Sequence, residues 1–291
     1  MRKKGDDPMT LKSGDYVARL SYAKDIVFRV TQIYRDENGE AAAVLKGVAV
    51  RLIADAPLTD LERLSEEEAR NNGPEGEGEA RLLAALARRS GEGLFRGGRT
   101  FDYPGLVLHL DGDGEYLKKC AAAYEKLGIP HVGLAVPEKD QPEAVGYYLA
   151  RYRPEILVLT GHDSLIRDAK DRRDLDLYRA SFHFAEAVRR ARQYQPDRDG
   201  LVIFAGACQS CYEELIRAGA NFASSPERVF IHIFDPVLVI ERIAFTSIKE
   251  VLPAEEAVKA SVTGAAGIGG VETRGCFRRG YPKIAEKVLR F

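Results

Sequence analysis

Residues 201–208 read LVIFAGAC, and this stretch decides the fold of the larger part of the chain. A short apolar run that stops at a glycine is typical of a buried parallel strand followed by a tight loop. Four other apolar runs resemble it, at residues 106–110, 132–136, 156–159 and 229–234. Stretches with helical periodicity separate the first four runs in chain order. Strands that alternate with helices predict an α/β domain, in which helices cover both faces of a parallel sheet.

Helices are predicted between and after these runs. Apolar residues recur with helical spacing at residues 115–127, 143–152, 178–188, 209–219 and 254–262. One face of the third stretch carries Tyr178, Phe182, Ala185 and Val188. Gly219 is a suitable C-terminal stop for the fourth. Residues 236–245 are instead rich in β-branched side chains, which favour strands, and residues 264–270 are rich in glycine.

Residues 1–56 predict a separate small domain. Short runs of the β-branched and aromatic residues that favour strands recur there, at residues 16–20, 26–34, 41–45 and 49–53. Residues 36–39 read DENG, and asparagine and glycine tolerate the positive φ of a hairpin turn. Short antiparallel strands at this spacing predict a small SH3-like β-barrel.

Residues 57–104 differ from both neighbours in composition. Residues 71–78 read NNGPEGEG and residues 90–99 read SGEGLFRGGR, with a short helical piece between them at residues 80–89. Such sequences bury too little apolar surface to order themselves, so we predict a flexible linker. The α/β domain then occupies residues 105–291.

The overall composition excludes several classes of protein. The 43 Lys and Arg residues nearly balance the 44 Asp and Glu residues, so the formal charge is −1 and a general nucleic-acid binder is not expected. No apolar run approaches the roughly 18 residues that span a bilayer, and no secretory signal begins the chain. Four scattered cysteines predict a reducing, cytoplasmic location. No motif indicates a metal or another cofactor.

Functional side chains are expected at the carboxyl edge of the parallel sheet, where open α/β folds bind ligands. The residues just beyond the apolar runs include a histidine and a cysteine, His162 and Cys208. If their two strands are neighbours, the strand axes lie about 4.8 Å apart, so the imidazole and the sulfur can approach each other. This is the arrangement of a thiolate nucleophile with a histidine partner.

The predicted helix at residues 209–219 would place Cys208 at a helix N-terminus, where backbone N–H groups stabilise a thiolate and an oxyanion. Three other interpretations remain open. Cys208 could be an inert core residue, it could form a redox pair with Cys211, or it could serve an amidohydrolase or glutaminase with His232 as base.

The same residues carry a family resemblance. An apolar strand ending in Thr160-Gly161-His162, followed by a strand ending in Ala207-Cys208, resembles the caspase–legumain–clostripain group of cysteine peptidases. The chain is more specifically similar to the YabG-type sporulation-specific proteases of endospore-forming bacteria. That similarity rests on residues 14–22 (GDYVARLSY), 159–163 (LTGHD) and 204–210 (FAGACQS). It implies a caspase-like fold for the α/β domain.

The resemblance also assigns roles. It implies that Cys208 is the nucleophile, that His162 is its general base and acid, and that the backbone N–H groups of Cys208 and Asp163 form the oxyanion hole. The broader group has glycine where this chain has Asp163. The implied substrates are spore coat and germination proteins, cleaved after basic residues. A basic side chain needs a carboxylate partner, and four aspartates at the sheet edge are candidates: Asp111, Asp113, Asp163 and Asp235. Alternatively, these aspartates serve as helix caps or in turns.

Two further hypotheses concern the location and processing of the chain. The resemblance implies the mother-cell cytoplasm or the assembled spore coat. Four arginines in the predicted linker suggest self-cleavage, namely Arg88, Arg89, Arg96 and Arg99. A non-enzymatic alternative is an interaction protein of the coat, whose barrel would bind partners.

Overall fold

The structure is a computed structural model, and it describes residues 11–71, 75–91, 100–166 and 172–282. The chain divides into two compact units, Met1–Gly76 and Glu77–Phe291. No helix in the described ranges is both long enough and apolar enough to cross a membrane.

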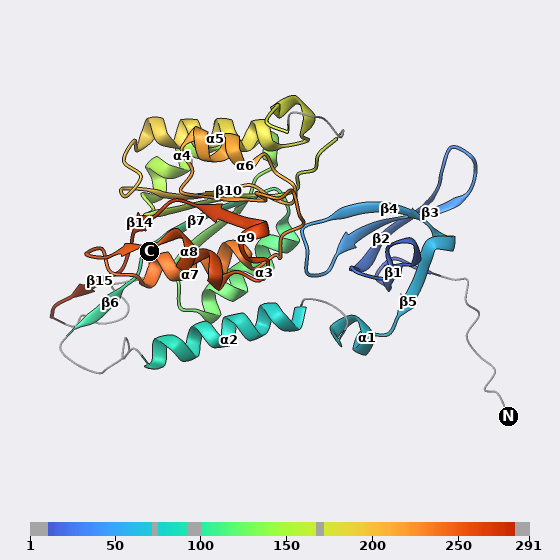
Figure 1. Cartoon of the computed structure of the whole chain (residues 1–291), viewed down its shortest axis with the longest axis horizontal. Helices are drawn as coiled ribbons and strands as arrows, with labels where there is room; N and C mark the ends of the chain where they lie inside the picture. Colours follow the sequence, from blue (N-terminus) through green and yellow to red (C-terminus); the bar gives the residue numbers. More distant parts are fainter. Residues whose placement is uncertain (1–10, 72–74, 92–99, 167–171, 283–291) are drawn as a thin grey trace. The chain divides into compact units, whose positions relative to one another are not determined.

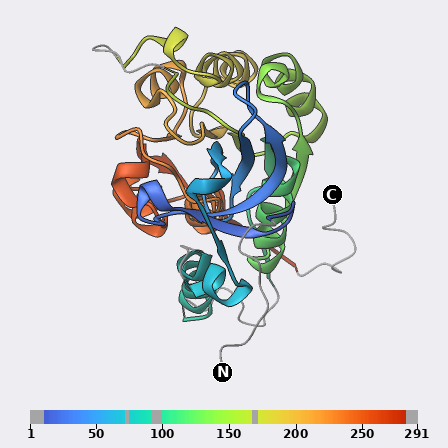
Figure 2. The same cartoon turned by 90° about the vertical axis from the view of Figure 1, so that its right-hand side faces the viewer.

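The N-terminal unit is a strongly curved antiparallel sheet (Figures 1 and 2). Its strand order is β4-β3-β2-β1-β5. The strands are β1 (Tyr16–Arg19), β2 (Val27–Arg35), β3 (Ala41–Gly47), β4 (Ile53–Pro57) and β5 (Leu61–Leu64). Short 3-10 helices follow β1 and β4, at Leu20–Tyr22 and Leu58–Asp60.

Local sequence explains this sheet. The predicted turn after β2 forms, with Gly39 at a φ of +80° and its N–H donating to the Asp36 carbonyl at 2.9 Å. Alternate strand residues face one small core, which is formed by Val17, Phe28, Val30, Ala43, Leu45 and Ala56. The sheet continues to Leu64, beyond the predicted boundary at residue 56. Residues 61–64 complete the sheet because they pair with β1.

The C-terminal unit is built on a six-stranded sheet in the order β13-β11-β10-β9-β7-β8. The pairs among β8, β7, β9, β10 and β11 are parallel, and β13 is antiparallel to β11. The strands are β7 (Val107–Asp111), β8 (His131–Ala135), β9 (Ile156–Thr160), β10 (Val202–Ala205), β11 (Phe222–Ser224) and β13 (Ile268–Gly270). The α/β prediction is therefore confirmed, with a mixed and largely parallel sheet.

Helices cover both faces of this sheet, and each face has its own apolar core (Figure 1). One face packs against α4 (Gln141–Tyr152), α5 (Ser181–Tyr194) and α6 (Tyr212–Ala218). The other packs against α2 (Glu75–Gly91), α3 (Gly114–Lys126), α7 (Asp235–Phe245) and α8 (Ala254–Ala260). Strand residues that alternate between the two cores are buried on both sides, which explains their continuous apolar sequences.

Two predicted strands do not form. Residues 229–234 are irregular, and the strand that follows β10 is β11, at Phe222–Ser224. Residues 236–245, rich in β-branched side chains, form the helix α7. Pro236 occupies its first turn, where a proline fits, and nearly every residue of the helix is buried. Burial on all sides overrides the weak strand preference of valine and isoleucine.

Residues 57–104 contain more regular structure than a flexible linker would have. Besides β5, they include α1 (Glu66–Asn71), α2 and β6 (Phe101–Tyr103), which pairs with β15 (Arg278–Gly280). Ser65 and Glu68 form a reciprocal capping box that starts α1. Leu82 and Ala85 of α2 are buried in the same core as α7. The acidic and glycine-rich composition obscured this apolar face.

The remaining elements of the C-terminal unit are short. The glycine-rich residues 264–270 form α9 (Gly264–Gly267) and β13, and β13 belongs to the sheet. A second two-stranded sheet pairs β12 (Val251–Leu252) with β14 (Thr273–Arg274). The 3-10 helices of this unit are η3 (Glu138–Asp140) and η4 (Leu175–Leu177).

Candidate active site

Adjacent strands carry His162 and Cys208 to the same edge of the sheet. β9 and β10 pair in parallel, and their last paired residues are Leu159 and Ala205. His162 is the third residue after Leu159, and Cys208 is the third residue after Ala205. The predicted neighbouring strands are therefore present, with their axes about 4.8 Å apart.

The imidazole of His162 is held in a defined orientation. Its Nε2 lies 2.8 Å from Oδ2 of Asp113, and 18% of the His162 side chain is exposed. The other oxygen of Asp113 accepts two backbone N–H groups, so this carboxylate acts as an acceptor and Nε2 carries the proton. Nδ1 is buried and makes no hydrogen bond to any described residue. In the neutral ring, Nδ1 is thus the basic nitrogen.

Asp113 also starts helix α3. It is the N-cap residue, and its Oδ1 accepts the N–H groups of Glu115 and Tyr116 at 2.9 and 3.1 Å. The Tyr116 ring lies against the His162 ring, with 5.5 Å between the ring centroids. The start of α3 therefore fixes both the hydrogen-bond partner and the packing of the histidine. The predicted alternative of a capping role is confirmed for Asp113.

Cys208 lies in an apolar environment. Its side chain is wholly buried in the core that contains Phe204 and Ile231. The N–H of Ile231 donates to Sγ at 3.3 Å, and such a donor can stabilise negative charge on sulfur. The prediction that Cys208 begins a helix is wrong, because α6 starts at Tyr212 with Cys211 as its N-cap. Gln209, at a φ of +57°, redirects the chain first.

A hydrogen-bonded chain joins the loop that carries His162 to the loop that carries Cys208. Oδ2 of Asp163 accepts from the Ser210 hydroxyl at 2.9 Å, and that hydroxyl accepts the N–H of Ala207 at 2.9 Å. The residues next to the histidine and next to the cysteine are thereby connected. Asp163 has no positive φ, so this position does not require the glycine of the broader group.

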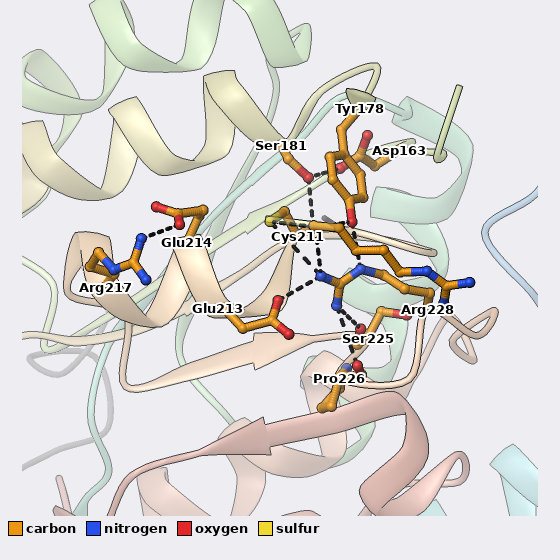
Figure 3. A network of polar contacts seen from close by, with 11 residues as sticks. Asp163, Tyr178, Ser181, Cys211, Glu213, Glu214, Arg217, Ser225, Pro226 and Arg228 are labelled. Carbon is orange, nitrogen blue, oxygen red and sulfur yellow. Dashed lines mark hydrogen bonds and ion pairs between the residues drawn. The ribbon is translucent and has the colours of Figure 1, made fainter. Parts of the chain in front are cut away.

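Asp163 makes further contacts inside the same network (Figure 3). Its Oδ2 also accepts from Ser181, whose hydroxyl accepts the Cys211 N–H at 2.7 Å, and its Oδ1 accepts the Ala180 N–H at 2.7 Å. Burial raises the pKa of the Asp163 carboxyl, and the hydrogen bonds from these donors act in the opposite direction. Because both serines donate to it and accept from backbone N–H groups, the geometry fits the ionised form.

Arg228 makes further polar contacts around Cys211, at one end of this network. Its guanidinium donates to Tyr178 Oη at 2.6 Å and pairs with Glu213 at 2.5 Å (Figure 3). It also lies 3.9 Å from Sγ of Cys211. Burial raises the pKa of the Cys211 thiol, although Arg228 acts in the opposite direction. Cys211 is thus a buried thiol of the loop after β10.

All four carboxylates predicted to receive a basic substrate side chain use both oxygens within the protein. Asp111 accepts the N–H of Asp113 and the hydroxyl of Thr160, each at 2.9 Å. Asp235 accepts backbone N–H groups of His232 and Val262. Asp113 and Asp163 are occupied as described above. A pocket role for these four stays a prediction, and their geometry favours the alternative of caps and turns.

The other histidines have structural surroundings. His232 is buried, its Nδ1 accepts the N–H of Phe234 at 3.0 Å, and a Cβ at Gly78 of α2 would collide with its ring. His109 lies inside β7 and contacts Thr160 at 2.7 Å. The contacts of His232 hold this side chain in the core, and the amidohydrolase interpretation stays a prediction.

Sequence reasoning missed one carboxylate at this edge. Glu138 follows β8, and its Oε1 accepts the backbone N–H of His162 at 2.6 Å. A Cβ at Gly112 or Gly161 would collide with this carboxylate, so both glycines make room for it. The signal was present, because residues 132–136 form an apolar run like the others and Glu138 comes two residues after it.

The donor set of the site does not indicate a metal. Within the described ranges, no three His, Cys, Asp or Glu side chains are grouped as a metal site would require. The arrangement instead offers a thiol, an oriented imidazole and a nearby backbone donor. The N–H of Asp163, a predicted oxyanion donor, makes no hydrogen bond to any other described residue.

Comparison with known proteins identifies relatives over almost the whole chain. The sequence profile of the family described as YabG peptidase U57 matches residues 12–282. The sporulation-specific protease YabG of Bacillus subtilis (strain 168) is 42% identical over 287 residues, which cover 94% of this chain and 99% of that protein. The resemblance inferred from short motifs is thereby confirmed over both structural units.

Proposed function

The chain belongs to the YabG peptidase family, and from that premise we propose that it is a cysteine endopeptidase with Cys208 as nucleophile and His162 as general base and acid. Asp113 positions the imidazole of His162. The observation that carries this proposal is the buried Nδ1 of His162, which has no hydrogen-bond partner among the described residues, on a ring whose Nε2 is held by Asp113.

The proposed reaction follows from these positions. Nδ1 of His162 removes the thiol proton of Cys208, and the sulfur attacks the carbonyl carbon of a peptide bond. The backbone N–H groups of Cys208 and Asp163 stabilise the oxyanion. His162 then returns the proton to the leaving amine, which departs as the C–N bond breaks. Water, activated by His162, hydrolyses the thioester and restores the thiol.

Substrate access requires a change around the sulfur. Cys208 has no exposed surface, and its sulfur contacts the backbone of Ile231. A peptide carbonyl reaches the sulfur only after the segment around Ile231 has moved. That segment is irregular and lies outside the sheet, so its displacement leaves the strand register that carries His162 and Cys208 intact.

The substrates we propose are spore coat and germination proteins, cleaved after arginine, in the mother cell or in the assembled coat. The support is the similarity to a protein named as a sporulation-specific protease. We also propose a caspase-like fold for the C-terminal unit and an SH3-like barrel for the N-terminal unit. The support is the order of parallel strands in the first case and the five curved antiparallel strands in the second.

Self-cleavage within residues 57–104 remains part of this proposal, but two of its four sites are disfavoured. Arg88 and Arg89 lie in α2 and pair with Glu241, and Arg89 is buried with its guanidinium 4.0 Å above the Phe245 ring. A folded, buried helix is a poor substrate for a protease. Arg96 and Arg99 lie outside the described residues.

Cleavage of an arginine-containing peptide tests the proposal. We expect Cys208→Ala and His162→Ala to lose cleavage while both variants keep the circular dichroism of the parent. The matched control is His232→Ala, which removes the histidine of the amidohydrolase alternative. Full activity of the Cys208→Ala variant would contradict the proposal. Loss of activity in His232→Ala with an active His162→Ala would favour the alternative.

A further inference from the structure

The proposed preference for arginine needs a carboxylate that can receive a guanidinium close to the reacting groups. The four aspartates at the sheet edge have both oxygens bound within the protein. An arginine side chain could reach one of them only by displacing existing hydrogen bonds. Each of these aspartates therefore fits a structural role better than substrate recognition.

Glu138 differs from the aspartates in its position and in its hydrogen bonding. It begins η3, after the edge strand β8, and its side chain extends over the ends of β7 and β9. Gly112 and Gly161, which follow those two strands, leave the space that its carboxylate occupies. The carboxylate is therefore placed at the edge that carries His162, and not over the outer strand from which it comes.

One oxygen of Glu138 is fixed and the other is available. Oε1 accepts the His162 N–H at 2.6 Å, which sets the distance between this carboxylate and the backbone of the histidine. Among the described residues, Oε2 accepts no hydrogen bond and Glu138 forms no ion pair with a lysine or arginine. The side chain is partly exposed, so an incoming group can reach it.

We propose that Glu138 determines specificity by receiving the guanidinium of a substrate arginine at Oε2. This inference rests on the proposed peptidase function, because it takes the site around His162 as the place of cleavage. A guanidinium offers several N–H donors in a planar fork, which suits a carboxylate held on one side. Because Oε1 is bound to the His162 backbone, the arginine would be seated beside the catalytic histidine.

Substitution of Glu138 by glutamine is the direct test. Glutamine keeps an oxygen that can accept the His162 N–H and removes the charge that would attract arginine. For a peptide with arginine before the scissile bond, we expect kcat/KM of the Glu138→Gln variant to fall about 10- to 100-fold, as for the loss of a charged hydrogen bond. For a matched peptide with glutamine at that position, we expect no change beyond about twofold.

Two further variants serve as controls. Asp140→Asn removes the same charge two residues away on an exposed side chain, and its ratio of arginine to glutamine cleavage should equal that of the parent. Glu138→Asp keeps the charge and should retain a preference for arginine. An unchanged ratio in Glu138→Gln, with cleavage still dependent on Cys208, would overturn the proposal.

A binding measurement separates this proposal from the proposed function. The uncleaved arginine peptide is titrated by calorimetry into the Cys208→Ala variant and into Cys208→Ala combined with Glu138→Gln. We expect at least about tenfold weaker binding to the double variant. Equal binding would overturn the role of Glu138, whatever the enzyme cleaves. Cleavage that is independent of Cys208 would instead overturn the cysteine peptidase function.

Discussion

Asp113→Asn isolates the effect of Asp113 on the protonation of His162. The wild-type carboxylate accepts a hydrogen bond from the Nε2–H group at 2.8 Å and leaves Nδ1 basic. In the variant, Oδ1 of asparagine still accepts the N–H groups at the start of α3, so its NH2 group faces Nε2. A donor at this place favours the tautomer with the proton on Nδ1. That nitrogen can then no longer accept the thiol proton of Cys208.

The size of the effect follows from what is lost and what is kept. General base catalysis contributes about 10²- to 10⁴-fold to rate, so kcat should fall by that factor. This corresponds to an increase of about 2.7–5.4 kcal/mol in the activation free energy. The helix cap is retained, because asparagine caps about as well as aspartate, and the lost charge near the helix end is worth about 0.5 kcal/mol. The variant should therefore be almost as stable as the parent.

The assay compares kcat, KM and thermal unfolding for Asp113→Asn and Asp113→Ala. Alanine removes the cap, which costs about 1 kcal/mol of folding free energy, but leaves the imidazole free to adopt either tautomer. We expect the asparagine variant to be the more stable and the less active of the two, with KM nearly unchanged in both. A kcat of Asp113→Asn within about threefold of the parent would refute the positioning role.

Three other predictions follow from the same network and its surroundings. Ser210→Ala leaves the buried Ala207 N–H without its acceptor. The free energy of unfolding, measured in a denaturant titration, should therefore fall by about 2–3 kcal/mol. Unchanged stability would contradict the link between the loops. When the segment around Ile231 moves, the Cys208 thiol becomes accessible beside the proposed base His162. Iodoacetamide near neutral pH should then label Cys208 before Cys211 and Cys276, because burial raises the pKa of the latter two thiols, for Cys276 to about 12. Equal labelling would contradict activation of Cys208. Arg192→Met should lower the free energy of unfolding by about 3 kcal/mol, because the Arg192 guanidinium donates to several backbone carbonyls. The control Arg189→Met, on an exposed side chain, should change it by less than about 0.5 kcal/mol.

The parts of the fold that were predictable are those buried on two faces. Residues 106–110, 132–136, 156–159 and 201–205 read as continuous apolar runs because both faces of the sheet are covered. The strand β11 has three residues and lacks such a run. Residues 229–234 have an apolar run, but their backbone bonds to the loop after β10, as in the contact between Gln209 N–H and the Val229 carbonyl. Apolar sequence reports burial, not strand pairing.

The placement of His162 and Cys208 after two adjacent strands was predictable because the end of a parallel strand can be located from its sequence. The partners of these residues were not. Whether Asp113 caps a helix, binds His162 or does both depends on side-chain directions in a loop, which residue spacing does not specify. The sequence places Glu138 after an apolar run, but it does not show that the side chain extends over the ends of two other strands, into space left by Gly112 and Gly161.

The cover over Cys208 and the framework that carries it are held by different contacts. The framework consists of paired strands and of the Asp163–Ser210 hydrogen bond, which lies between the two loops. The cover around Ile231 is attached to the cysteine loop by a sulfur contact at 3.3 Å and by the Gln209–Val229 backbone bond. A hydrogen bond to a neutral thiol is weak, so the sulfur contact of the cover is weaker than the hydrogen bond to the Asp163 carboxylate that joins the two loops. Exposure of the sulfur can therefore change while the histidine and the cysteine keep their relative positions, which allows the proposed site to be assembled before a substrate reaches it.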